Sequence, residues 1–82
     1  DIKEKRFIFH TIAAKMNLGD DVNLEIFINK PDKITGAMIS AICQEAGLQA
    51  IRKNRYIIIQ KDLDIAYKLN VATKLSIFDP YQ

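Results

Sequence analysis

The sequence has few residues that form covalent cross-links or carry out chemistry. Its 82 residues include one cysteine, one histidine, two prolines and no tryptophan. Cys43 cannot form an internal disulfide and has no partner thiols for a metal site, which favours a reducing compartment and a buried hydrophobic role. His10 has no recognisable catalytic companions, so we expect it to be a partly buried polar residue. The sequence therefore predicts neither catalytic nor metal-binding residues.

Long apolar runs and a strong charge of one sign are also missing. No segment approaches the roughly 20 apolar residues that a membrane-spanning helix needs, and no signal peptide is visible. The formal net charge is +2, which is too small to indicate nucleic-acid binding by itself. The length allows one small domain. Because the chain starts in a charged helical pattern, we expect it to be part of a larger protein.

The apolar residues that are present recur at helical spacing and predict an all-α fold, a small bundle of about four helices. Helices are expected over residues 1–16, 24–29, 35–55 and 62–70, with a short extended segment near residues 56–59. Asp1, Asn23 and Thr35 are the predicted N-caps, and Gly19 suits a helix stop. The pattern weakens after Asn70. Residues 1–70 are therefore predicted to form the domain and residues 71–82 a C-terminal tail.

The helix predicted over residues 35–55 has one apolar stripe and hints at a second. Small residues along this helix would let another helix approach closely, and the mid-helix Gly47 suggests a packing reason, because glycine is a poor helix former. Leu48 and Ile51 lie off the main stripe and predict a second covered face. The stripe itself consists of Ile39, Ile42, Cys43, Ala46 and Ala50. Inward positions on the other helices are Phe9, Ile12, Ala13, Met16, Leu63, Ala66, Tyr67 and Leu69.

A basic cluster, Arg52, Lys53 and Arg55, closes this helix. Its cations favour the negative end of the helix dipole, and they could instead contact an acidic partner. The alternative function is a small helical nucleic-acid-binding domain that uses the same three residues. The low net charge and the lack of base-reading polar residues on one exposed helix face weigh against that alternative.

Two segments carry a family resemblance: "KMNLGDDVNLE" at residues 15–25 and "ITGAMISAICQEAGLQAIRKNRY" at residues 34–56. They resemble the C-terminal helical lid of AAA ATPases, most closely the proteasomal branch and a subunit of the eukaryotic proteasome regulatory particle. The alternative within the family is the lid of another AAA branch, such as an archaeal proteasomal ATPase or a membrane-fusion ATPase. The resemblance covers residues 1–70 firmly and the tail loosely. It implies a non-catalytic domain of an ATP-hydrolysing parent.

The resemblance also implies a nucleotide contact. In this family the start of the third helix approaches the adenine and ribose of ATP, which is held by the preceding large domain. Gly36 and Ala37 match those positions, and a bare backbone permits close approach. Many members carry a base-contacting histidine where this sequence has Ile12, and His10 lies about 200° around the helix from that position. ATP is thus expected in the full-length parent and no cofactor in this chain alone.

The implied partners include the ankyrin-repeat assembly chaperone gankyrin. Its concave surface recognises a basic set at the first helix, matched by Lys3 and Arg6, and an acidic set after it, matched by Asp20 and Asp21. Cations at a helix N-terminus oppose the helix dipole, and a partner's carboxylates would offset this cost. Reversing Asp20 and Asp21 to lysine is expected to weaken chaperone binding without unfolding the domain.

Neighbouring ATPase subunits and the proteasome core particle are the other implied partners. Several proteasomal ATPases end in a hydrophobic residue, tyrosine and one more residue, and this tail inserts into the core particle. Tyr81 and Gln82 match the end of that pattern, whereas Pro80 replaces the hydrophobic residue. The implied role is ATP-dependent unfolding and translocation of substrates into the proteasome, in the cytoplasm and nucleus, with neither membrane nor nucleic acid as partner.

Overall fold

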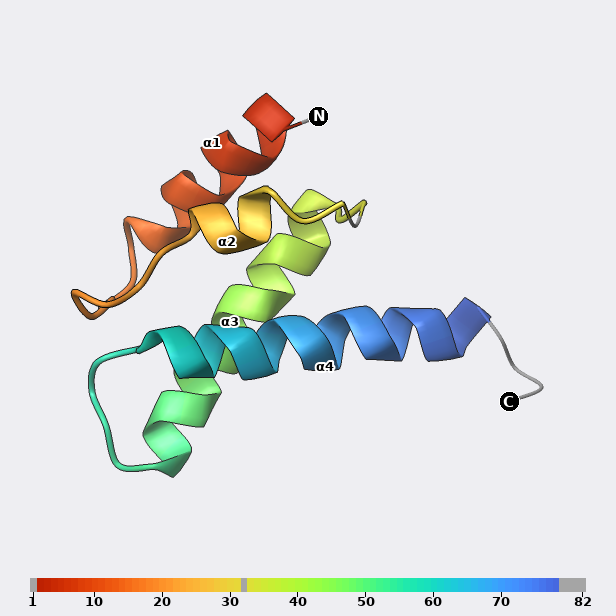
Figure 1. Ribbon diagram of the computed structural model, residues 1–82. Helices are drawn as coiled ribbons and strands as arrows, with labels where there is room; N and C mark the ends of the chain where they lie inside the picture. Colours follow the sequence, from red (N-terminus) through yellow and green to blue (C-terminus); the bar gives the residue numbers. More distant parts are fainter. Residues whose placement is uncertain (1, 32, 79–82) are drawn as a thin grey trace.

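The computed structural model describes residues 2–31 and 33–78, and along them the chain forms four α-helices. The predicted all-α bundle is therefore confirmed. In Figure 1, α4 crosses α3, and these two helices form the main packing contact, while α1 packs on α3 and α2 packs on α1. The helices are α1 (Ile2–Ala13), α2 (Glu25–Ile28), α3 (Gly36–Arg52) and α4 (Gln60–Phe78).

The start of α3 follows the sequence prediction, whereas its end lies three residues earlier than predicted. The Thr35 hydroxyl accepts a hydrogen bond from the Met38 N–H at 3.1 Å, as expected of an N-cap. At the other end the helix stops at Arg52, not Arg55, because Asn54 adopts a left-handed φ of 57°. The Arg55 N–H then bonds to the Ala50 carbonyl at 2.9 Å, which completes a Schellman-type cap.

The first helix is shorter than predicted, because a tertiary contact captures the residues that follow it. Instead of continuing to Met16, α1 ends at Ala13. The next residues form an isolated parallel bridge between Leu18 and Ile58, within the extended segment expected near residues 56–59. Gly19 is part of this contact and donates its N–H to the Ile58 carbonyl at 2.8 Å, so its predicted role as a helix stop is wrong. Asp1 lies outside the described residues.

The short helix α2 spans 25–28, within the predicted residues 24–29. The N-cap position is Leu24, whose side chain makes no capping hydrogen bond, and not Asn23 as predicted. Asn23 lies one residue earlier, where its side-chain oxygen accepts the Glu25 N–H at 3.1 Å. A helix of four residues cannot be stable by itself. It is held by Phe27, whose ring stacks against Phe9 of α1 and Tyr67 of α4. The aromatic stack therefore joins three helices.

The last helix begins earlier and ends later than predicted. It starts at Gln60 instead of Asp62 and continues past Asn70 to Phe78. Asp62 lies in the first turn, where its carboxylate reaches back to the Ile59 N–H at 3.0 Å, as in a capping box. The division into a domain at 1–70 and a tail at 71–82 stays a prediction.

The core contains most of the predicted inward positions. Phe9, Ala13 and all five stripe residues of α3 are buried, as are Leu63, Ala66 and Tyr67 of α4. Ile12 and Met16 are partly buried and pack against this core. Leu69 is 47% exposed, so its inward assignment is wrong. The sequence pattern thus identified the faces of α1 and α3 better than that of α4.

Candidate functional site

The first turn of α3 lies at the surface of the domain. Ala37 is exposed and Gly36 is half-buried. Gly36 lines a hollow of about 600 Å³ between the start of α1 and the segment before α3, together with Lys5 and Lys33. This turn is accessible to a neighbour outside the chain, as the predicted nucleotide contact requires.

The packing of this chain does not explain why residue 36 is glycine. Its φ is not left-handed, and an added Cβ would meet only Ile8 Cδ1, at an ordinary contact distance of 3.7 Å. Gly19 is different, since a Cβ there would come within 3.0 Å of Asp21 Oδ1 and 3.3 Å of the Ile58 carbonyl oxygen. A Cβ would therefore be crowded at Gly19, whereas at Gly36 no part of the described structure accounts for the glycine.

The residues considered for the family's histidine lie on different sides of α1. Ile12 is half-buried and lines a groove against α3. The predicted partly buried position of His10 is wrong, because its side chain is 57% exposed and lies 3.9 Å from the Glu25 carboxylate. His10 therefore faces α2 and does not substitute for the missing histidine beside α3.

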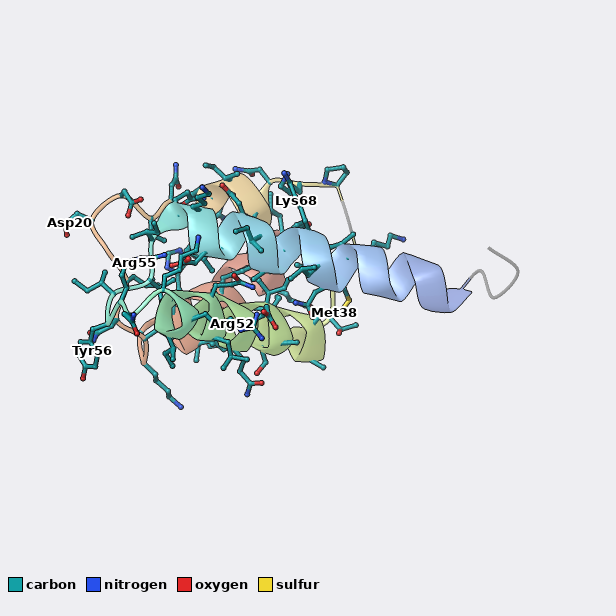
Figure 2. The ribbon with its side chains drawn as sticks, turned by 90° about the horizontal axis from the view of Figure 1, so that it is seen from below. Asp20, Met38, Arg52, Arg55, Tyr56 and Lys68 are labelled. Atoms are coloured by element: carbon teal, nitrogen blue, oxygen red, sulfur yellow. The ribbon has the colours of Figure 1, made fainter. Side chains whose placement is uncertain are left out.

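The predicted partner-binding charges stand at the two ends of α1. Lys3 and Arg6 lie in its first two turns, and Asp20 and Asp21 lie in the loop after it, at whose tip Asp20 is labelled in Figure 2. The 12 residues of α1 make the helix roughly 18 Å long, at 1.5 Å per residue, and the two sets lie toward its opposite ends. Such a separation suits an extended partner surface with two complementary patches.

Arg6 and Asp21 already have partners within the chain. Arg6 forms a forked ion pair with Glu25 at 2.9 and 3.0 Å and holds the pKa of that carboxyl below its ordinary value. The Asp21 carboxylate accepts the N–H of Gln60, the first residue of α4, at 3.2 Å. Asp20 is exposed. Reversal of Asp21 would therefore also disturb the start of α4, so the expectation that reversing both acids leaves the fold intact needs revision.

The basic cluster at the end of α3 is mostly engaged inside the domain. Arg55 donates two hydrogen bonds to the Asp62 carboxylate, at 2.7 and 3.0 Å, and Asp62 is fully buried. Arg52 lies 3.6 Å from the Glu45 carboxylate. Two of the three cations proposed for nucleic-acid binding are thus paired with carboxylates, so this alternative gains no support.

Sequence reasoning missed the Arg55–Asp62 pair because it assigned each residue a local role at a helix end. The pair spans the connector between α3 and α4, and Figure 2 shows Arg55 turned toward the body of the domain. Arg55 lowers the pKa of Asp62 mainly through this hydrogen bond, and the Ile59 N–H adds to the effect. The sequence does contain a signal for this pair, because Asp62 is the third residue of α4 and Arg55 lies in the connector before that helix.

Other residues singled out from the sequence carry no described chemistry. Cys43 is buried as predicted, and burial raises the pKa of its thiol to about 11, so it stays protonated at neutral pH. Within residues 2–31 and 33–78, no group of three His, Cys, Asp or Glu side chains could hold a metal ion. None of the helices described is long and apolar enough to span a membrane. Tyr81 and Gln82 lie outside the described residues.

Comparisons with known proteins agree with this geometry. The family described as "AAA+ lid domain" matches residues 21–65, the part that runs from the acidic loop through α3 into α4. The match is to the lid, the part of an AAA protein for which we expected no catalytic role.

Three relatives are similar over essentially the whole chain. They are the "Probable 26S proteasome regulatory subunit 6B" of Caenorhabditis elegans, 50% identical, and the "26S proteasome regulatory subunit 6B homolog" of Dictyostelium discoideum and of Saccharomyces cerevisiae, each 49% identical. The alignments cover 99–100% of this chain and 20% of each relative, so the chain spans about a fifth of their length. The predicted resemblance to a subunit of the proteasome regulatory particle is confirmed, and the chain belongs to the AAA+ lid domain family.

Proposed function

We propose that this chain is the lid of a proteasomal ATPase subunit and closes over ATP bound by a preceding large domain. Changes in nucleotide state would move the packed helices as a rigid body and pass motion to neighbouring subunits. In the cytoplasm and nucleus this motion would help to unfold substrates and move them into the proteasome. The reaction itself would take place in the large domain.

The observation that carries this proposal is the open first turn of α3. Gly36 has room for a Cβ within its own chain and Ala37 is exposed, so small residues there are not demanded by the fold. A ligand held by another domain would explain the small residues, because only a bare backbone lets an adenine or ribose approach within contact distance. The 50% identity to a relative named as a proteasome regulatory subunit supports the same role.

Ala37→Leu tests the nucleotide contact. Leucine is a good helix former and position 37 is exposed, so the stability of the 82-residue chain should change by less than about 0.5 kcal/mol. In the full-length subunit, the larger side chain should weaken binding of a fluorescent ATP analogue at least tenfold, or about 1.4 kcal/mol. Ala14→Leu, at an exposed alanine after α1, is the matched control and should leave affinity unchanged. Equal affinities for both variants would count against the proposal.

The chaperone contact proposed for the charged ends of α1 also gains a sharper test. Because Asp20 is exposed, Asp20→Lys should weaken binding to gankyrin at least tenfold in titration calorimetry while the thermal midpoint stays unchanged. Glu45→Lys makes the same charge change on α3 and should leave the affinity for gankyrin unaffected. Asp21→Lys should lower the midpoint as well, because it removes the acceptor of the Gln60 N–H. Unchanged affinity of the Asp20 variant would reject this interface.

Docking of the C-terminal Tyr81 and Gln82 to the core particle remains a prediction from the sequence. Both residues lie outside the part of the chain that the structure describes. Contacts with neighbouring ATPase subunits are proposed on the family resemblance. The exposed Leu48 and Ile51 are consistent with such contacts, because the second face of α3, predicted to be covered, is left open by the described residues.

A further inference from the structure

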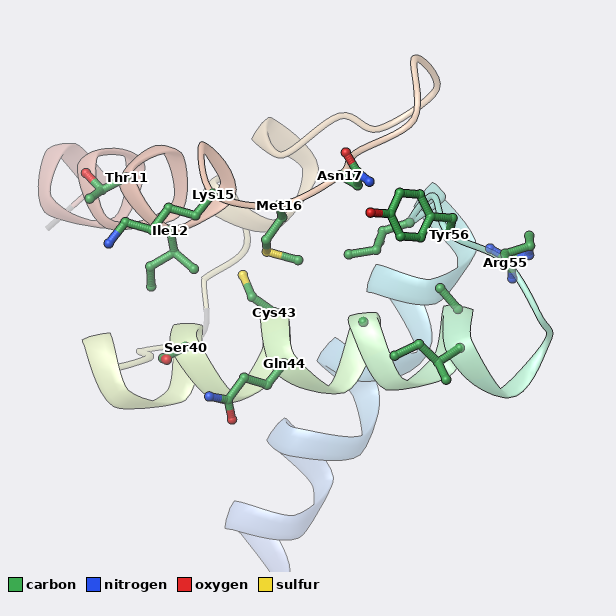
Figure 3. Close-up of a pocket in the computed structure, with 14 residues that line it drawn as sticks. Thr11, Ile12, Lys15, Met16, Asn17, Ser40, Cys43, Gln44, Arg55 and Tyr56 are labelled. Carbon is green, nitrogen blue, oxygen red and sulfur yellow. The ribbon is translucent and has the colours of Figure 1, made fainter.

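A groove of about 540 Å³ runs between α1, α3 and the connector that follows α3. Figure 3 shows Ile12 of α1, and Met16 in the segment after it, facing Cys43 of α3, with Tyr56 of the connector at one end. Neither Gly36 nor Ala37 lines this groove. The groove is therefore separate from the proposed nucleotide contact.

Gly47 lines the groove in the middle of α3, where glycine is among the poorest helix formers. Its φ is not left-handed, and apart from neighbouring backbone no atom of the described structure lies within 4 Å of a Cβ built there. The domain would thus accept an alanine, and its helix would gain from it. The missing side chain keeps the groove open at this point, which is the condition for close approach of another backbone.

The mouth of the groove exposes large apolar side chains. Ile51 is 67% exposed and Tyr56 is 87% exposed, and both line the groove. Together with the apolar wall formed by Ile12, Met16 and Ile58, they offer a surface that would bury apolar area against a partner. Tyrosine at the rim is a residue type that often dominates binding at interfaces.

The charge of the groove selects the partner. The charged residues among those lining it are Lys15 and Arg55, both basic, and no acidic residue lines it. Asp62 neutralises Arg55, so the exposed Lys15 gives the mouth of the groove a positive charge. An apolar partner segment with a carboxylate at its edge complements this arrangement, whereas one with a lysine there is repelled.

We propose that this groove binds an amphipathic helix of a separate protein, with its apolar face over Gly47 and an acidic side chain facing Lys15. A helix fits because the groove lies between two helices, and a small residue on one of them lets a third helix pack closely. In this mode of binding, apolar side chains at helical spacing enter the groove, and the acidic side chain at the edge fixes the orientation of the bound helix.

The 82-residue chain and two synthetic peptides test this proposal. Both peptides are about five helical turns long, with leucines at positions i, i+3, i+4 and i+7. One carries glutamates beside the apolar face and the other carries lysines. The glutamate peptide should bind, with the largest amide chemical-shift changes at Gly47 and Tyr56, and the lysine peptide should bind at least tenfold more weakly. Lys15→Glu should reverse the preference between the peptides.

Gly47→Leu provides a second variant that cannot be confused with unfolding. Leucine should keep or raise the thermal midpoint of the chain, because it replaces a poor helix former, yet its side chain should fill the groove and weaken the glutamate peptide at least tenfold. Failure of both peptides to bind, equal binding of the two, or shifts centred away from the groove would overturn the proposal. So would a dimer in sedimentation that Gly47→Leu disperses, because the occupant would then be a second copy.

Discussion

The Arg55→Met variant should be far less stable than the parent chain, because it leaves the fully buried Asp62 carboxylate without its counter-charge. Removing one partner of a buried ion pair is strongly destabilising, although the Arg55 side chain is 29% exposed and water screens part of the loss. A domain of this size has a total free energy of unfolding of only about 4–12 kcal/mol. Urea denaturation followed by circular dichroism should therefore show a transition at much lower urea, or no folded baseline at all.

A double variant separates the loss of charge pairing from loss of packing. Arg55→Met combined with Asp62→Leu replaces the pair by apolar side chains and should recover much of the lost stability, since no charge is left buried without a partner. Full recovery is not expected, because the Ile59 N–H also loses its acceptor. A double variant no more stable than the single one would show that the cost does not arise from the isolated carboxylate.

The pH dependence identifies the same carboxylate. Arg55 depresses the pKa of Asp62, so the stability from the pair is fully present above the unfolded-state pKa of about 3.9. It is lost as the pH falls through the lower pKa of the folded state. The gap in stability between the parent and Arg55→Met should therefore narrow below about pH 4. A gap that stays constant between neutral and acid pH would assign the loss to another cause.

The pair has a structural consequence for the proposed lid. It lies in the connector between α3 and α4, and the Asn54 turn and the Ile58–Leu18 bridge fix the same segment. Three different constraints thus hold the crossing of the two longest helices. A lid that transmits motion as a rigid body needs this kind of restraint at its bends, since a loose connector would absorb the motion.

Local rules were enough to predict α3. Its Thr35 cap depends on the residue type at one position, and its buried stripe depends on a spacing that only a helix produces. Elsewhere the outcome depended on contacts distant in sequence. The end of α1 was set by pairing with Ile58, and at the start of α4 the distant Asp21 carboxylate adds a contact to the local Asp62 cap.

The site could be predicted only in part, because a sequence does not say whether a small residue serves the fold or a partner. Gly19, Gly36 and Gly47 look alike as letters. In the structure the Ile58 backbone lies close to Gly19, whereas Gly36 and Gly47 have room for a side chain. Likewise, Leu48 and Ile51 were expected to be covered, and they are exposed because no element within residues 2–31 and 33–78 packs over them.

Phe27→Ala should destabilise the domain by about 3–5 kcal/mol, the range for removing a buried phenylalanine. Phe27 is 1% exposed, and its ring centroid lies 6.3 Å from that of Phe9 and 5.3 Å from that of Tyr67. Alanine would remove both ring contacts and leave a cavity where α1, α2 and α4 meet. Thermal unfolding and hydrogen exchange of the chain should show the loss.

The chain offers a matched control in Phe7, which lies on α1 and is 72% exposed. Phe7→Ala removes the same atoms from a side chain that is already in water, so stability should change by less than about 0.5 kcal/mol. Hydrogen exchange should distinguish two forms of damage in the Phe27 variant. Because α2 has four residues and depends on the stack, its amides should lose protection along with those of α1 and α4. Loss confined to α2 would instead mean that α2 is a separate local unit, and that the aromatic stack does not couple the helices of the lid.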